Sequence, residues 1–166
     1  ADRTADIARN WANLHVLSGK PLPKGWTGKL WAIHQGLDYA NTKIPETEFV
    51  LMTDADIEHG PDSIRQLVFK AQNEHLHLVS LMVSLRTESF WEKLLIPAFI
   101  YFFQKLYPFP WVNDPTSPTA AAAGGCMLIR RKILKNAGGV ERIRDQLIDD
   151  CSIGRLMKAC GPIWLG

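Results

Sequence analysis

The chain has 166 residues, of which 46% are hydrophobic and 22% are charged. This length and composition exclude a disordered tail and predict one domain, residues 1–166, with a single substantial core. The formal net charge of +2 is too small, and the lysines and arginines too scattered, to indicate nucleic-acid binding. The three cysteines lack the close pairing of a zinc or redox motif, so we expect three small core residues in a reducing, cytoplasmic compartment.

Helical and extended segments alternate through the first half of the chain. In order, the expected elements are a helix that begins at Asp2 or Thr4 with Ile7, Trp11 and Leu14 on its apolar face, a short strand at 15–17, a loop at 21–28, a helix over 29–40, a strand at 48–53, a helix around 64–71 and a strand at 78–85. Strands separated by helices predict an α/β fold with a mostly parallel sheet and helices on both faces.

The second half is less regular. Its expected elements are a helix over 88–103 with a kink or break near Pro97, a loop with four prolines at 108–118, a turn and strand at 120–129, a helix from about 132 that ends at 138–139, and a last helix over 152–159. The apolar stretch at 94–103 is too short to span a membrane. It fits a buried core helix or a helix that lies in the membrane interface.

Two carboxylates follow the strand predicted at 48–53. Asp54 and Asp56 are separated by one residue and stand where that strand ends. Ligands of open α/β sheets bind at the carboxyl ends of strands, and neighbouring carboxylates repel each other unless a cation lies between them. The pair therefore predicts a site for a hard divalent ion such as Mg²⁺, which takes one or two carboxylates and phosphate oxygens. The alternative is a turn and cap before the helix that opens near residue 61.

A second acidic pair, Asp149–Asp150, stands far from the first along the chain. If the fold brings both pairs to one cleft, one pair can hold a cation while the other abstracts a proton from an alcohol. The alternative is that Asp149–Asp150 caps the helix that follows it, because Asp is a preferred N-cap residue.

Four blocks in register carry a family resemblance. They are Trp-Thr-Gly-Lys-Leu-Trp-Ala at 26–32, Thr-Asp-Ala-Asp at 53–56, Ala-Gly-Gly-Cys-Met-Leu-Ile-Arg-Arg at 123–131 and Asp-Asp at 149–150. The chain resembles an inverting family 2 glycosyltransferase, and within that family it is most similar to the hopene-associated glycosyltransferases of bacteria. This resemblance implies a GT-A fold, a Rossmann-like and mostly parallel sheet that binds a nucleotide-diphosphate sugar.

On the donor side, the resemblance implies a metal and a nucleotide site. Asp54 and Asp56 match the Asp-x-Asp pair that holds Mg²⁺ or Mn²⁺ against the donor diphosphate, with Asp56 the more direct ligand. Lys29 matches a Gly-Lys segment on the nucleotide side of the cleft, although a solvated lysine at a helix start has the same local sequence.

On the acceptor side, the resemblance implies a base and a close turn. Asp150 matches the carboxylate that acts as catalytic base, and Asp149 stands where the family more often has Glu. Gly124 and Gly125 match a small-residue turn beside the acceptor. Two glycines equally suit tight strand packing.

The resemblance also implies a fragment of a longer protein. The family begins with a strand and an acidic turn that bind the nucleobase, and residues 2–5 resemble only the end of that turn. Members commonly continue into membrane-anchoring helices. We therefore expect a catalytic domain without its first strand, peripheral to or anchored at the inner face of the cell membrane when complete. The resemblance implies a hydroxyl acceptor on a lipid, such as a hopanoid, or on a sugar, and the aromatic stretch 99–111 favours a lipid-like acceptor near a membrane surface.

Two alternatives come from other functional classes. A haloacid-dehalogenase-type phosphatase also places Asp-x-Asp after a strand and uses a later acidic pair, but its first motif normally continues with Gly-Thr, where this chain has Ile57–Glu58. The third interpretation is a truncated module that binds nucleotide without catalysis.

Overall fold

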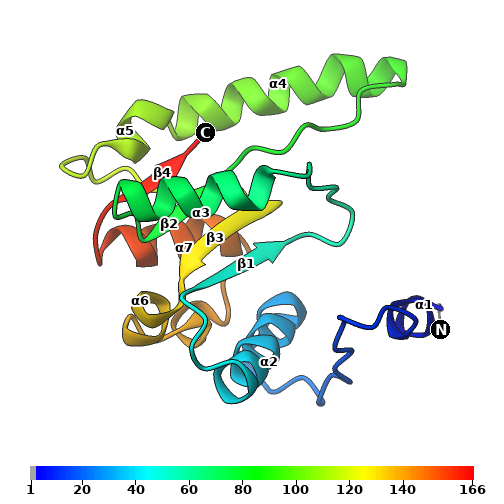
Figure 1. Cartoon of the computed structure of the whole chain (residues 1–166). Helices are drawn as coiled ribbons and strands as arrows, with labels where there is room; N and C mark the ends of the chain where they lie inside the picture. Colours follow the sequence, from blue (N-terminus) through cyan, green and yellow to red (C-terminus); the bar gives the residue numbers. More distant parts are fainter. Residues whose placement is uncertain (1–2) are drawn as a thin grey trace.

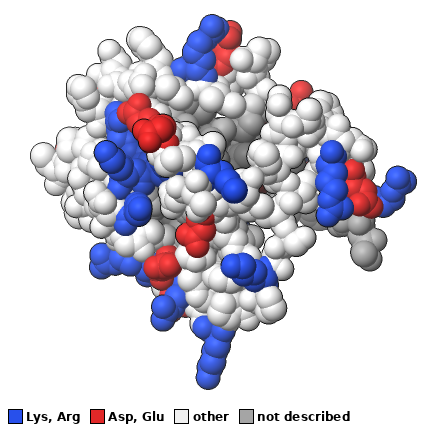
Figure 2. Space-filling model, turned by 60° about the horizontal axis from the view of Figure 1, so that its bottom comes forward, with Lys and Arg blue, Asp and Glu red and all other residues white. Residues whose placement is uncertain are grey.

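A computed structural model describes residues 3–166 and arranges them as helices around a small sheet (Figure 1). The helices are α1 (Thr4–Arg9), α2 (Gly28–Lys43), α3 (Ser63–Asn73), α4 (Phe90–Leu106), α5 (Phe109–Asn113), α6 (Arg131–Asn136), the 3₁₀ helix η1 (Val140–Ile143) and α7 (Asp149–Lys158). The strands are β1 (Phe49–Thr53), β2 (Leu78–Ser80), β3 (Cys126–Arg130) and β4 (Ile163–Leu165). Basic and acidic side chains are interspersed on the face shown in Figure 2, without a broad patch of one sign.

The sheet is mixed, in the order β1-β3-β2-β4. Strands β1, β2 and β4 run in the same direction, as the alternation of helices and strands predicted. Strand β3 runs the opposite way between β1 and β2, so both of its ladders are antiparallel and only β2 and β4 pair in parallel. The prediction of a mostly parallel sheet is therefore only partly confirmed. Strand direction escaped sequence analysis because a buried apolar strand has the same pattern in either direction.

Both faces of the sheet are covered, as expected. On β3, Met127 and Ile129 belong to a core cluster that also contains buried residues of α2, α6 and α7. The alternate residues Cys126 and Leu128 pack in a second cluster beneath α3. This alternation follows from the two-residue period of a strand. Each fully buried Leu, Ile or Met contributes roughly 1.5–3 kcal/mol, so the central strand anchors the fold.

The N-terminal elements differ from the prediction. Helix α1 ends at Arg9, and the apolar side chains of Ile7, Trp11 and Leu14 are 55–67% exposed. Such a short helix is marginal without packing, so it does not continue to Leu14. The strand predicted at 15–17 is absent, because no neighbouring strand pairs with it. Asp2, the alternative start of the helix, lies outside the described residues.

Pairing also decides where the later strands end. The strand predicted over 78–85 stops at Ser80, which pairs with Met127. Because β3 runs antiparallel to β2 and begins at Cys126, only that one residue of β3 lies beyond this pair. Beyond that point only single backbone hydrogen bonds continue, from Leu81 N to the Cys126 carbonyl and from Met82 N to the Gly166 carbonyl. Strand β4 was not predicted, because three residues are too few to show a periodicity.

Helix α4 is one continuous helix across Pro97, so the predicted break is wrong. A capping box at its start, in which Ser89 and Glu92 bond each other's backbone N–H groups, compensates for the hydrogen bond that proline removes. Helix α5 also forms inside the segment predicted as loop, with Pro110 in its first turn, where proline is tolerated. In the part of the chain that the structure describes, no helix has the length and apolar character that crossing a bilayer requires.

Two of the three cysteines are core residues. Cys126 and Cys151 are buried, whereas Cys160 is exposed at the end of α7. The prediction of three core cysteines is therefore wrong for Cys160. All three are free thiols.

Candidate functional site

The end of β1 carries Asp54 to the edge of the sheet. The last residue of the strand, Thr53, pairs with Cys126 at the start of β3. Its hydroxyl donates a hydrogen bond to the Gly125 carbonyl at 2.9 Å. This bond ties the end of β1 to the turn that precedes β3. Asp54 follows directly and is partly exposed, with 43% of its side-chain surface accessible.

Lys29 lies between two carboxylates that come from different parts of the chain. Thr27 caps helix α2 and accepts a hydrogen bond from Leu30 N, which places Lys29 in the first turn. The Lys29 Nζ atom is 3.2 Å from Asp54 Oδ1 and 3.3 Å from Asp149 Oδ2. A cation is unfavourable at a helix N-terminus, so these carboxylates offset the helix dipole. Partial burial opposes the effect, but Asp149 and Asp54 together raise the pKa of Lys29 above its usual value.

The first turn of α7 supplies the second acidic pair. Asp149 and Asp150 are the first two residues of the helix, and Ile148 occupies the N-cap position without a side-chain cap. The predicted position at a helix start is therefore right, but neither Asp is the N-cap residue. The Asp149 side chain is 14% exposed, and its Oδ2 atom is buried with no hydrogen bond, because its contact with Lys29 lacks hydrogen-bond geometry.

Asp150 is held by two backbone N–H groups. Its Oδ2 atom accepts a hydrogen bond from Gly124 N at 3.1 Å, and its Oδ1 atom accepts one from Cys151 N at 2.7 Å. Gly124 lies 26 residues earlier in the chain. A carboxylate fixed by both oxygens keeps one orientation, which suits a group that must meet a substrate hydroxyl.

The two glycines have different surroundings. A Cβ atom on Gly124 would lie 3.4 Å from Asp150 Oδ2 and 3.6 Å from Lys29 Nζ, so this glycine borders the charged cluster. A Cβ atom on Gly125 would lie 2.9 Å from a Val83 methyl group. The closeness of Val83 therefore explains why residue 125 is a glycine, whereas Gly124 leaves space beside the carboxylates.

Asp56 does not join this cluster. It is exposed in the turn after Asp54, and its side chain makes no ion pair or hydrogen bond within residues 3–166. The structure thus brings together Lys29, Asp54, Gly124, Asp149 and Asp150. Asp56 is two residues after Asp54 in the sequence, but it is exposed to solvent.

A cavity of about 700 Å³ adjoins the cluster. It lies between α2 and the exposed edge of β1, and its walls include Lys29, Asp54 and Gly124. Most of its remaining wall is apolar, from residues such as Ile33 and Met52. This volume is in the range of small-molecule sites in proteins.

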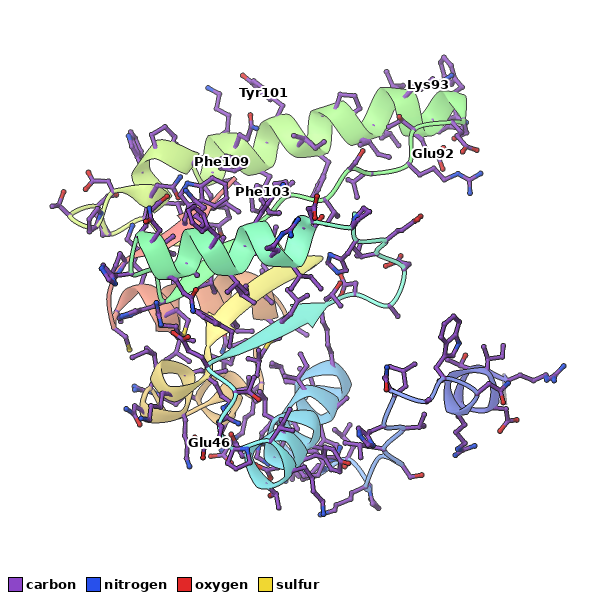
Figure 3. The ribbon with its side chains drawn as sticks, in the orientation of Figure 1. Glu46, Glu92, Lys93, Tyr101, Phe103 and Phe109 are labelled. Carbon is purple, nitrogen blue, oxygen red and sulfur yellow. The ribbon has the colours of Figure 1, made fainter. Side chains whose placement is uncertain are left out.

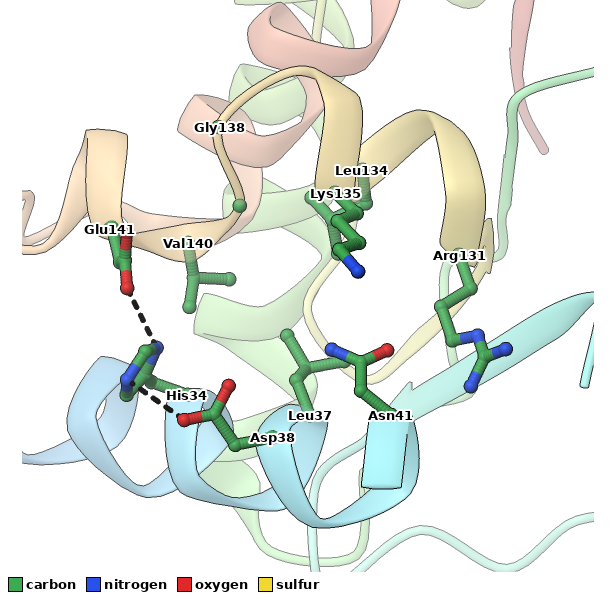
Figure 4. Close-up of a pocket in the computed structure, with 11 residues that line it drawn as sticks. His34, Leu37, Asp38, Asn41, Arg131, Leu134, Lys135, Gly138, Val140 and Glu141 are labelled. Atoms are coloured by element: carbon green, nitrogen blue, oxygen red, sulfur yellow. Dashed lines mark ion pairs between the residues drawn. The ribbon is translucent and has the colours of Figure 1, made fainter. Parts of the chain in front are cut away.

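A smaller cavity of about 260 Å³ lies between α2, α6 and η1 (Figure 4). There His34 is 3.4 Å from Asp38 on the same helix and 3.6 Å from Glu141, and the second contact joins α2 to η1. None of the predicted site residues lines this cavity. The larger cavity is therefore the candidate active site.

With this geometry in place, the comparison with known families is decisive. A model of glycosyl transferase family 2 matches residues 1–138. The chain belongs to glycosyl transferase family 2. A comparison with curated proteins finds no match. The predicted family is thus confirmed, and the protein is a glycosyltransferase with a nucleotide-sugar donor and a glycosyl acceptor.

The family match includes Lys29, Asp54 and Gly124 but ends before Asp149 and Asp150. In this family 2 glycosyltransferase, the position of the second acidic pair in the site is therefore an observation of the structure alone. The mixed four-stranded sheet with helices on both faces is consistent with a GT-A-like domain.

Three neighbours of the site escaped sequence analysis. Thr53 bonds to the glycine turn, and Tyr107 packs on the core cluster that contains Cys151, the residue after Asp150. Thr53 is signalled by its place at the end of the strand. Tyr107 carries no sequence signal, because only tertiary packing brings it near Cys151.

Proposed function

We propose that this family 2 glycosyltransferase inverts the anomeric centre of its donor and that Asp150 is the catalytic base. The observation that carries the proposal is the convergence of Lys29, Asp54, Asp149 and Asp150, from three separate elements, beside one cavity. A sugar or lipid hydroxyl is a poor nucleophile at neutral pH. A carboxylate within hydrogen-bond reach takes its proton in the transition state, a contribution of about 10²–10⁴-fold.

The donor diphosphate would bind on the Lys29 and Asp54 side of the cavity. Lys29 supplies a positive charge there, and its partners Asp54 and Asp149 hold the ammonium in place. When phosphate oxygens approach, Lys29 can exchange a carboxylate for a phosphate as its partner.

Asp54 and Asp56 would hold Mg²⁺ or Mn²⁺. Their oxygens are the hard ligands that these ions prefer, and both side chains are accessible. Among the described residues, no group of three or more His, Cys, Asp or Glu side chains is arranged to bind a metal. A pair of carboxylates is the protein donor set of an ion that completes its coordination with water and phosphate oxygens. When bound, the ion supplies charge neutralisation of the departing diphosphate.

The acceptor would be a hydroxyl of a lipid-like molecule, such as a hopanoid, at the inner face of the cell membrane. Support comes from the resemblance to hopene-associated members of the family and from the aromatic residues of α4. The transferred sugar would be a hexose.

The experiment is donor turnover by the chain and two variants. UDP-, GDP- and dTDP-sugars are supplied with Mn²⁺, and release of the nucleoside diphosphate is measured. Asp150→Asn should lower kcat by about 10²–10⁴-fold because the base is lost. Asp56→Asn should abolish turnover at limiting Mn²⁺ and recover partly at high Mn²⁺. The control is Asp62→Asn, an exposed carboxylate at the start of α3.

Normal kcat in Asp150→Asn, with an unchanged unfolding transition, would refute the assignment of the base. The phosphatase alternative is disfavoured by the family match, and release of phosphate from a phosphomonoester without sugar transfer would revive it. Donor binding without turnover would instead identify a non-catalytic module.

A further inference from the structure

Helix α4 exposes an unusually apolar face to solvent. Its outer face consists of eight large side chains, each 54–71% exposed: Phe90, Trp91, Leu94, Leu95, Phe99, Tyr101, Phe102 and Leu106. The inner side of the helix packs through Phe103 and the following Tyr107 against the core. Figure 3 shows Tyr101 on the side away from the molecule, whereas Phe103 and Phe109 lie on the side toward α3.

This face is too large to be incidental. At 100° per residue, its members cover about half of the helix circumference along its whole length. Together they expose on the order of 1,000 Å² of apolar surface, more than the largest patch of a typical monomeric protein. An apolar surface of this size indicates a partner.

The charges around the outer face indicate which partner. Lys105 projects from within the face, where its ammonium lies 5.9 Å from the Tyr101 ring. Lys93 lies at its border, and neither lysine forms an ion pair in the described part of the chain. The nearby acids are engaged, since Glu92 caps the helix and Glu88 pairs with Arg86.

In a dimer formed through this face, a second copy of this chain would bring another lysine to the same face without supplying a counter-charge. Burying an unpaired ammonium is strongly unfavourable. At a lipid surface, by contrast, a lysine extends its charge to the phosphate groups while its methylenes stay in the apolar layer. Trp and Tyr side chains are likewise enriched at membrane interfaces.

The outer face is also connected to the acceptor side of the site. Helix α4 ends at Leu106, and the next residue, Tyr107, packs near Cys151, the residue after Asp150. Tyr107 packs on the core cluster to which Cys151 belongs. The inner side of α4 and the start of α7, which carries Asp150, thus pack on the same core.

We propose that the outer face of α4 docks in the interface of a lipid bilayer with anionic headgroups, and that this docking holds the catalytic domain at the surface that contains a membrane-embedded acceptor. The docking itself needs no turnover. Only the identity of the acceptor rests on the proposed function.

The test is flotation with vesicles of phosphatidylcholine alone and with about one third phosphatidylglycerol. The chain should float with both and bind the anionic vesicles more tightly. Leu95→Glu and Phe102→Glu should each weaken binding at least tenfold, because each places a charge in the apolar layer. Lys105→Gln should weaken binding to anionic vesicles by about fivefold and leave binding to neutral vesicles almost unchanged.

The matched control is Phe69→Glu, which alters a phenylalanine that is 68% exposed on α3. All these positions are exposed, so circular dichroism should show native folding in every variant. Absence of flotation by the unmodified chain, or an equal loss in Phe69→Glu, would overturn the proposal. So would a dimer in light scattering that Phe102→Glu converts to a monomer without any vesicle binding, since a second copy would then cover the face. Turnover of soluble substrates by a chain that never binds vesicles would refute this inference and leave the proposed function intact.

Discussion

Lys29 balances the charge of the candidate site. The Asp54 and Asp56 pair predicted a metal ion that offsets the repulsion between carboxylates, and the structure shows an ammonium group between Asp54 and Asp149. The pKa of Lys29 is raised above its ordinary value of 10.5. The contribution of the ion pairs to stability is thus complete below that value and is lost only as pH rises through the raised pKa. Near neutral pH, the pairs are fully formed.

Replacing Lys29 by Met should lower the free energy of unfolding by about 1 kcal/mol, because Asp149 Oδ2 is buried and would lose its neighbouring charge. The value is modest since Lys29 and Asp54 are each more than 40% exposed. Urea unfolding at neutral pH measures this change in the free energy of unfolding. Lys24→Met, at an exposed lysine of the preceding loop, is the control.

A double-mutant cycle separates the pair from other effects of the substitution. In the Asp149→Asn background, Lys29→Met should cost clearly less, because the buried charge is already gone. An equal cost in both backgrounds would show that Lys29 acts on stability by some route other than Asp149.

At the scale of elements, α7 is positioned by close packing against the segment before β3. A Cβ atom on Gly154 would lie 2.6 Å from the Ala121 carbonyl carbon and 2.9 Å from Ala122 N. These are backbone atoms, so they cannot rotate away. The absence of a side chain at Gly154 is what allows α7 to approach and bring Asp150 to Gly124.

Gly154→Ala should therefore destabilise the fold by about 1–3 kcal/mol through overpacking, although helix propensity alone would favour alanine by about 1 kcal/mol. Thermal unfolding shows whether the Gly154→Ala protein is less or more stable than the unmodified chain. The control is Gly36→Ala in α2, where a Cβ atom would have nothing within 4 Å. That variant should be neutral or slightly stabilised, and a Gly154→Ala protein as stable as Gly36→Ala would contradict the packing argument.

The capping box of α4 makes its start sensitive to acid. The Glu92 carboxylate accepts hydrogen bonds from Ser89 N and Glu88 N, and these bonds lower its pKa. The stabilisation is therefore present above the ordinary value of 4.5 and is lost as pH falls through the lowered pKa.

Glu92→Gln should flatten the pH dependence of stability below about pH 5, because glutamine does not titrate. Thermal unfolding followed by circular dichroism from neutral to acidic pH provides the comparison. Glu46→Gln, an exposed glutamate far from α4 (Figure 3), should keep the pH dependence of the unmodified chain. If both variants lose it equally, the capping box is not its source.

For the whole molecule, the direction of β3 decides where the site forms. Because β3 runs antiparallel to β1, its first residue pairs with the last residue of β1. The glycine turn before β3 thus lies at the carboxyl end of β1, beside Asp54. In a parallel pairing, Gly124 would lie at the opposite end of the strand, away from Lys29.

The sequence by itself determined the family, the helices α2, α3, α6 and α7, the strands β1 and β3, and the identity of most site residues. These follow from local causes: apolar periodicity, caps, glycine stops and short motifs around Lys29 and Asp54. They depend on residues near one another in the chain, which a single sequence displays directly.

Only the tertiary structure decided the mixed strand order, the contact of Lys29 with both Asp54 and Asp149, the exclusion of Asp56 from that cluster and the outward face of α4. Each depends on which surfaces meet. An apolar strand or helix can pack against several partners, and its own sequence does not determine whether another element will cover it. Long-range packing makes that choice, so the charged cluster and the exposed aromatic face become visible only after the chain is folded.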